Sequence, residues 1–264
     1  MAHIFSLAGK HALVTGATGP LARALAVALA EAGANVSVTT LNNDRAEEVQ
    51  ANSILNECWA AGAKGTQALT LDLTNAAAVE AAVDALERDV APIDILVNAA
   101  HGANIKPVLE ATVADWQREL NRNATSVFVA CQVVGRRMVG RGKGRIINLV
   151  SVLHDRGIAN CALFGASQGA VLGFTKSLAI EWGRGEPLVQ QRVAVNALGV
   201  GFYSDVPGPQ QDPELHAILE RYIPNRRQGT PADLQGAVVY LASDIADYMQ
   251  GEVIVVDGAI TNHA

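Results

Sequence analysis

Short apolar segments alternate along this chain with longer segments in which apolar residues recur every three to four positions. The short segments predict buried strands, and the longer ones predict amphipathic helices. Such alternation requires right-handed crossovers, so it predicts an α/β protein with a doubly wound Rossmann fold: a seven-stranded parallel sheet with helices on both faces. The predicted strands are residues 11–15, 35–39, 65–71, 93–97, 145–149, 192–196 and 252–255.

The sequence also predicts several helix boundaries. Gly33 predicts the end of the first helix, since glycine adopts the left-handed conformation that often terminates a helix. Thr112 with Asp115 predicts a capping box that opens a long helix, and Thr230 with Asp233 predicts another with proline in its first turn. Two inner helix faces are marked by Leu21, Leu25 and Leu29 in the first helix and by Val79, Val83 and Leu86 in the third.

The composition fits a single globular domain over residues 1–264, because half of the residues are apolar and only 17% are charged. A net charge of -6 argues against a nucleic-acid partner, which needs clustered lysine and arginine. The one basic cluster is expected at a solvated helix end before a strand rather than in a binding patch. Its residues are Arg136, Arg137, Arg141, Lys143 and Arg145.

Cys58, Cys131 and Cys161 are odd in number and widely separated, which predicts free, buried thiols in a reducing compartment. Their spacing does not match any metal-ligand pattern, so no metal site is expected. The sequence has no secretory leader pattern and no uncharged stretch long enough to span a bilayer. We therefore expect a cytoplasmic protein without a membrane partner.

The turn after the first predicted strand, residues 15–22, reads TGATGPLA. Its position between a strand and a helix predicts a cradle for a phosphate group. Gly16 permits the tight turn, and Ala22 still allows close helix packing. Pro20 fits the first helical position but removes one N–H donor. The alternative is a plain strand-to-helix turn that binds no ligand.

Blocks of residues over nearly the whole chain resemble the short-chain dehydrogenase/reductase family. The glycine turn is similar to the family's TGxxxGxG, with Pro20 and Ala22 at its second and third glycines, and its spacing also fits the TGxxGxxG variant. On the cofactor side, Asp72 and Leu73 match the family's adenine-side residues, and Asn98, Ala99 and Ala100 match its NAG block. Asn123, seven residues after Trp116, matches the active-site asparagine, and Ser151 matches the catalytic serine. Residues 256–258 match the end of the family's sheet. The cofactor-binding residues that the resemblance implies are Gly16, Thr18, Gly19, Leu21, Thr40, Asp72, Leu73, Asn98, Ala99, Ala100, Gln168 and Gly201.

The chain departs from the family where the catalytic YxxxK motif is expected, thirteen residues beyond Ser151. Phe164 stands in place of the tyrosine and Gln168 in place of the lysine. In the family the tyrosine hydroxyl is the general acid or base, and the lysine lowers its pKa and holds the nicotinamide ribose. A phenyl ring has no proton to give. Gln168 can still hydrogen-bond ribose hydroxyls, but it brings no charge.

Three residues are candidates for a substitute proton donor. His154 lies three residues past Ser151, and its ordinary pKa suits proton transfer near neutrality; the alternative is a loop histidine paired with Asp155. Tyr203 follows the sixth strand and can offer a phenol from a new direction, or it can pack the pocket wall. His101 follows the NAG block, or it is an ordinary loop side chain.

The cofactor preference is set by the residues after the second strand. Thr40 replaces the acid by which the family selects NAD, and Arg45 is the nearby cation, which slightly favours NADP(H) over NAD(H). Thr40 can equally serve only to cap the strand. Residues 199–203 replace the family's APGxV, and Asp205 replaces a threonine that often contacts the carboxamide. The segment 206–223, with its prolines, is expected to form an ordered lid.

The leading functional hypothesis is an NAD(P)(H)-dependent oxidoreductase with a non-standard active site that transfers hydride to a small carbonyl or conjugated substrate. Ser151 would hold the substrate oxygen and Asn123 would organise a water molecule. One alternative is a catalytically silent homologue that acts as a binding or partner subunit. Another is a lyase or isomerase that needs no cofactor. The resemblance implies a homotetramer or homodimer, with residues 165–182 as the dimerisation helix, or an assembly with an active homologue.

Overall fold

The structure is a computed structural model, and it describes all residues except 1–3, 43, 101, 184–191, 205–212 and 263–264. Seven strands form one parallel sheet in the order β3-β2-β1-β4-β5-β6-β7. The predicted doubly wound Rossmann fold is confirmed. The strands are β1 (His11–Val14), β2 (Asn35–Thr40), β3 (Thr66–Thr70), β4 (Ile95–Asn98), β5 (Lys143–Ser151), β6 (Arg192–Val200) and β7 (Val253–Val256).

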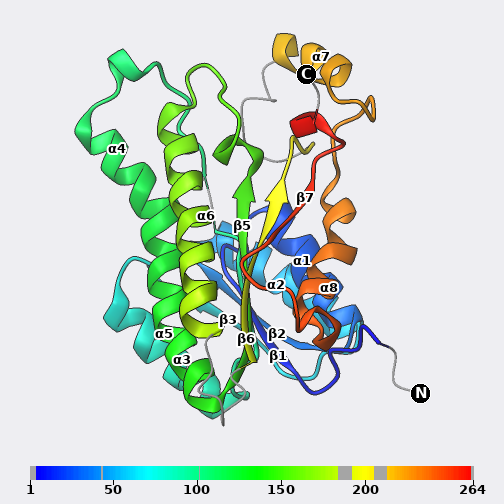
Figure 1. Cartoon of the computed structure of the whole chain (residues 1–264). Helices are drawn as coiled ribbons and strands as arrows, with labels where there is room; N and C mark the ends of the chain where they lie inside the picture. The colour runs from blue at the N-terminus through cyan, green and yellow to red at the C-terminus, as the bar shows by residue number, and fades with distance from the viewer. Residues whose placement is uncertain (1–3, 43, 101, 184–191, 205–212, 263–264) are drawn as a thin grey trace.

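Helices cover both faces of the sheet, as Figure 1 shows. One layer consists of α1 (Pro20–Glu31), α2 (Arg45–Ala60) and α8 (Gln235–Ala242), and the other of α3 (Ala76–Asp89), α5 (Ser126–Arg141) and α6 (Ala162–Gly183). Two further helices are α4 (Val113–Leu120), which precedes α5, and α7 (Pro213–Tyr222), which lies beyond the carboxyl ends of the strands. That edge is where ligands bind in sheets of this kind.

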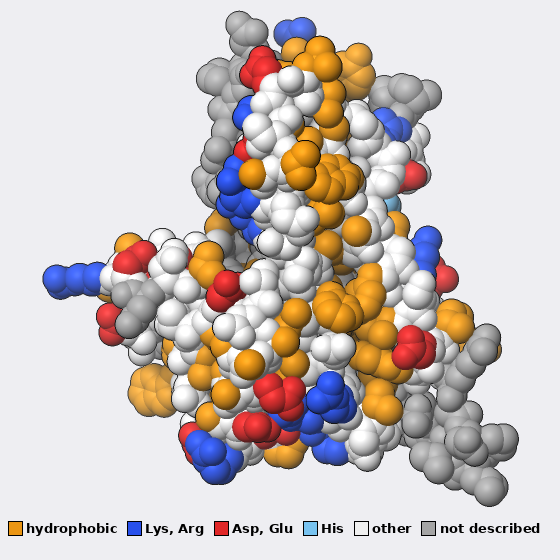
Figure 2. Space-filling view, turned by 90° about the vertical axis from the view of Figure 1, so that its left-hand side faces the viewer, with side chains coloured by type: hydrophobic (Ala, Val, Ile, Leu, Met, Phe, Trp, Pro, Cys, Tyr) orange, Lys and Arg blue, Asp and Glu red, His pale blue; other side chains and the backbone are white. Residues whose placement is uncertain are grey.

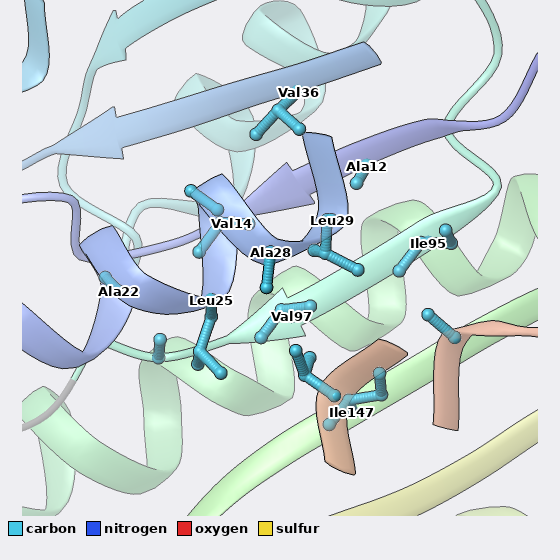
Figure 3. Packing of buried hydrophobic residues seen from close by; sticks show 14 of the residues in the cluster. Ala12, Val14, Ala22, Leu25, Ala28, Leu29, Val36, Ile95, Val97 and Ile147 are labelled. Carbon is cyan, nitrogen blue, oxygen red and sulfur yellow. The ribbon is translucent and has the colours of Figure 1, made fainter. Parts of the chain in front are cut away.

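Each layer of helices encloses its own apolar cluster, and the strands contribute to both. Along β1, Ala12 and Val14 pack in the cluster under α1, whereas Leu13 packs in the cluster on the opposite face. Side chains alternate between the two faces of a strand, so a sheet covered on both sides needs continuous apolar strands. Figure 3 shows Leu25 and Leu29 of α1 lying over the first of these faces.

The helix boundaries largely follow the predicted signals. α1 ends just before Gly33, whose φ is +102°. The box of Thr112 and Asp115 is formed, but the long helix that it was expected to open is divided into α4, a π-helical turn (Asn121–Thr125) and α5. The second predicted box is also formed, and it opens a short 3₁₀ helix (Pro231–Leu234) that leads into α8.

The prediction that the basic cluster is solvated is wrong for three of its members. Arg137 of α5 pairs with Glu80 of α3, and Arg141 of α5 donates to Glu87, which is also on α3. Arg145 is only 5% exposed and pairs with Asp247. These cations face carboxylates from segments distant in sequence, so they tie α5 and β5 to their neighbours.

All three cysteines are buried and free, as expected. Burial raises the pKa of Cys58 and Cys131 to about 12, so these thiols serve packing rather than chemistry. Among the described helices, none combines the length and apolar composition that crossing a membrane requires.

Candidate active site

The glycine turn is fixed between the ends of three neighbouring strands. Gly16 has a φ of +76°, and a Cβ at this position would lie 2.5 Å from Ala100 Cα. Thr39, near the end of β2, accepts hydrogen bonds from Gly16 N at its side-chain oxygen (3.2 Å) and from Ala17 N at its carbonyl (2.8 Å). Only glycine satisfies both the left-handed backbone and the close approach.

The turn leads into a helix whose first amides have no side-chain partner. Gly19 is the N-cap of α1 and offers no capping side chain, and the first turn of α1 contains no acidic residue. By contrast, Asp44, Asn75 and Thr112 cap α2, α3 and α4. Unpaired amides together with the helix dipole favour an anion at this end of α1. The geometry therefore fits the phosphate cradle, even with Pro20 at the first helical position.

Two of the predicted cofactor residues in this turn, Thr18 and Leu21, differ in exposure. The Leu21 side chain is 2% exposed and belongs to the core, so only its main chain can face a ligand. The Thr18 side chain is exposed. Leu21 is thus positioned to offer only its main chain, and Thr18 an exposed hydroxyl.

The residues after β2 and β3 are engaged with one another. Thr40 is buried, and its hydroxyl lies 2.9 Å from the hydroxyl of Thr70 on β3, which favours its interpretation as a strand-end residue. One oxygen of Asp72 accepts from Thr74 N and Thr74 Oγ1, so this carboxylate shapes the turn after β3. Leu73 packs against the core beneath it.

The segment after β4 presents backbone rather than side chains to the glycine turn. Ala99 N and Ala100 N both donate to Thr15 Oγ1, at 3.1 and 3.2 Å. The Asn98 side chain points into the core instead, where its Nδ2 donates to Asn148 Oδ1 at 2.8 Å. The close packing of this block against Gly16 requires the small residues that the sequence supplies.

Ser151, the last residue of β5, is held from α6 by Gln168. Its main-chain N–H donates to Gln168 Oε1 at 2.9 Å, and its hydroxyl accepts a long bond from Leu153 N at 3.3 Å. Gln168 is 3% exposed, and its Nε2 lies 3.4 Å from Ser167 Oγ. The glutamine therefore anchors the position of the serine.

Asn123 lies in the π-helical turn and has a full set of partners. Its Oδ1 accepts from Gly102 N at 2.9 Å, and its Nδ2 lies 3.0 Å from three acceptors that share its two hydrogens, Gly102 O, Glu119 Oε1 and Ser167 Oγ. Glu119 is 1% exposed, and burial raises the pKa of its carboxyl group. Glu119 and Ser167 were not singled out from the sequence, although Glu119 is four residues before Asn123 and thus on the same helix face.

The Phe164 ring lies in an apolar cluster at the carboxyl edge of the sheet. It is 5% exposed, and no phenol hydroxyl takes the place of the missing tyrosine within that cluster. The other buried members come from the turn after β5, the residue before α6, the segment after β6 and the C-terminal part of the chain. They are Val152, Leu153, Cys161, Phe202, Ile223 and Ile260.

The candidate proton donors have unlike surroundings. The His154 Nε2 atom is buried and has no hydrogen-bond partner among the described residues, and burial lowers the pKa of the ring. The Tyr203 hydroxyl donates to Val256 O at 2.8 Å, and burial raises the pKa of this phenol. The geometry thus favours the packing interpretation of Tyr203. His101 and Asp205 lie outside the described residues.

The segment after β6 approaches the end of β7 through Gly201. A Cβ at this position would lie 2.7 Å from Asp257 Cα, so glycine is required for the approach. The Asp257 carboxylate in turn accepts from Ala259 N and Thr261 N. These contacts fix the segment after β6 at the carboxyl edge of the sheet, where the predicted cofactor residues lie.

Comparisons with known proteins agree with this geometry. A family model described as Enoyl-(Acyl carrier protein) reductase matches residues 16–261. A short-chain type dehydrogenase/reductase from Mycobacterium marinum has a similar structure, with a TM-score of 0.85, 30% identity, and coverage of 98% of this chain and 97% of that one. The chain belongs to the short-chain dehydrogenase/reductase family.

Two further relatives of this short-chain dehydrogenase/reductase are named for sugar acids. Gluconate 5-dehydrogenase from Gluconobacter oxydans is 36% identical over 260 residues, which are 98% of this chain and 97% of the relative. The structure of a gluconate 5-dehydrogenase from Burkholderia cenocepacia in complex with NADP and tartrate matches with a TM-score of 0.88 and 30% identity, over 99% of this chain and 98% of that one. Both relatives are named dehydrogenases, which supports an oxidoreductase of the short-chain dehydrogenase/reductase type.

Proposed function

We propose that this short-chain dehydrogenase/reductase binds NADP(H) or NAD(H) at the carboxyl edge of its sheet and acts on a small carbonyl or conjugated substrate. The observation that carries the proposal is the turn at Gly16, where a Cβ would meet Ala100 and where α1 begins without a side-chain cap. Such an end offers amides to a pyrophosphate. When bound, the dinucleotide supplies the hydride.

The proposed active site lacks the family's tyrosine and lysine. Ser151 would hold the substrate oxygen, and Asn123 would organise a local water, while Phe164 contributes shape but no proton. Gln168 keeps Ser151 in place through the bond to its main-chain N–H. The proton would come from outside the Phe164 position. The leading source is His154, whose buried Nε2 has no hydrogen-bond partner among the described residues.

A catalytically silent binding subunit is the second candidate. The observation that favours it is the apolar surroundings of Phe164, since a site that transfers protons usually contains a polar group there. Activity of the purified protein toward ketones separates the two candidates.

The proposal includes a slight preference for NADP(H). Thr40 brings no carboxylate to the 2′-hydroxyl of the adenosine ribose, and Arg45 lies at the first position of α2. The complex of the Burkholderia cenocepacia relative with NADP is in keeping with this preference.

Titration with NADPH and NADH tests the proposed function directly. Both should bind to the parent protein, and Gly16→Ala should weaken binding of both by about tenfold or more, because the new methyl group forces the turn away from Ala100. Isothermal titration calorimetry measures both dissociation constants.

Gly140→Ala is the matched control for this experiment. Gly140 is an exposed residue of α5, and a Cβ there would meet no atom within 4 Å. It should leave binding unchanged and stabilise α5 by up to about 1 kcal/mol. Equal affinity in Gly16→Ala and the parent would refute the cradle, and no binding of either dinucleotide at millimolar concentration would favour a lyase or isomerase.

We also propose that the protein assembles into a homotetramer or homodimer. Each chain would form a single domain over residues 1–264, and the protein would be cytoplasmic. The face formed by α4, α5 and α6 supports the assembly, since hydrophobic side chains are exposed along it (Figure 2), among them Phe128 (44%) and Ile180 (58%). Light scattering at micromolar concentration should give a mass of two or four chains. A clean monomer would exclude this assembly, and with it the partner-subunit hypothesis in its homomeric form.

A further inference from the structure

The segment directly after β2 directs three N–H donors at one carboxylate. Leu41 N and Asn42 N donate to Glu47 Oε2 at 2.9 and 2.8 Å, and Asn42 Nδ2 donates to Glu47 Oε1 at 2.8 Å. Glu47 lies in the first turn of α2, and its own N–H is bound by the N-cap residue Asp44. Both oxygens of the Glu47 carboxylate are thus held by residues 41 and 42.

This carboxylate lies beside the proposed dinucleotide site. Leu41 comes two residues after Thr39, which binds the main chain of Gly16 and Ala17 in the glycine turn. In Rossmann folds the residues at the end of the second strand contact the adenosine ribose, where a 2′-hydroxyl marks NAD and a 2′-phosphate marks NADP. Consecutive backbone amides are common ligands of phosphate oxygens.

We propose that Glu47 sets the selectivity of this protein between NADP(H) and NAD(H). A 2′-phosphate and the Glu47 carboxylate would compete for the same amides, and their like charges repel each other. A 2′-hydroxyl carries no charge and leaves the Glu47 bonds intact. Glu47 therefore opposes the attraction that Arg45 exerts on a phosphate, and the ratio of affinities reflects the balance of the two.

The inference rests on the proposed dinucleotide function, and two variants test it. Glu47→Gln removes the charge and keeps an oxygen that can accept from the amides, whereas Glu47→Ala frees the amides as well. NADPH should bind about three- to tenfold more tightly to both variants, and more so to the alanine variant, while NADH affinity should change less than twofold. Calorimetric titration with each dinucleotide gives these constants without any turnover.

Glu48→Gln is the matched control, since Glu48 is an exposed residue of the same helical turn and its loss changes the net charge equally. Its affinity ratio should equal that of the parent. Adenosine 2′,5′-bisphosphate and 5′-AMP, titrated in parallel, should show the same selectivity shift in the Glu47 variants as the dinucleotides. An unchanged ratio in both Glu47 variants, with both dinucleotides bound, would overturn the inference and leave the proposed function standing. If neither NADPH nor NADH binds to any of the proteins, both the inference and the proposed function are overturned.

Discussion

Combining Phe164→Tyr with Gln168→Lys is expected to raise the rate of ketone reduction by about 10²- to 10⁴-fold over the parent protein. The tyrosine would supply a proton at the substrate oxygen, and the lysine would lower the pKa of that phenol. Ser151 and Asn123 already stand at the matching positions. Cofactor oxidation, measured for the parent, the two single variants and the double variant with simple ketones and keto-sugar acids, tests this expectation.

The single variants should have much smaller effects, because a lone tyrosine lacks its cation and a lone lysine has no phenol to act on. Gln168→Lys should also cost about 1 to 3 kcal/mol in the free energy of unfolding, since lysine cannot accept the bond from Ser151 N. A folded double variant that binds cofactor yet stays inactive would show that the site differs at further positions. High activity in the parent would show that Phe164 is no handicap.

Replacing His154 by phenylalanine is expected to lower activity about 10²- to 10⁴-fold if its imidazole supplies the proton. The same change should alter the free energy of unfolding only slightly, because Nε2, one of the two ring nitrogens that it removes, is buried without a described partner. Steady-state rates and a denaturant titration of the two proteins separate these effects. Full activity in His154→Phe would remove His154 from the mechanism.

The pH dependence adds a second measurement on His154. Burial lowers the pKa of its ring, so the protonated donor accumulates only below the ordinary value for histidine. The rate of reduction should therefore rise as the pH falls through this lowered pKa, and His154→Phe should lose that rise. Tyr203→Phe is the control: it should cost about 1 kcal/mol of stability through the lost bond to Val256 O and keep the pH profile of the parent.

Local patterns were sufficient to predict the sheet. All seven strands were found from short runs of β-branched and apolar residues between helical patterns, although the edge strand β3 (TQALT) is only half-buried. The box at Thr112 was found because its two partners are three residues apart. The π-helical turn at residues 121–125 was missed, because an insertion of this kind leaves the helical spacing of apolar residues nearly intact. The burial of Arg145 was missed because its partner Asp247 is more than a hundred residues away.

The candidate site shows the same division. Gly16 and Ser151 could be located from the sequence, since Gly16 lies just after β1 and Ser151 at the end of β5. Other contacts depend on side-chain directions that spacing does not fix. They are the bond from Ser151 N to Gln168, the bonds from Leu41 and Asn42 to Glu47, and the bond from Asn98 to Asn148 in the core. For this reason the sequence located the edge of the site better than it assigned roles within it.

The bond between Gln168 and Ser151 bears on the order in which the family's tyrosine and lysine can be lost or regained. A lysine that appears first at position 168 removes the acceptor for a buried amide and brings no catalytic gain. A tyrosine that appears first at position 164 leaves that bond in place. Mutational paths between the two forms of this site therefore favour the same intermediate in both directions, with tyrosine at position 164 and glutamine at position 168.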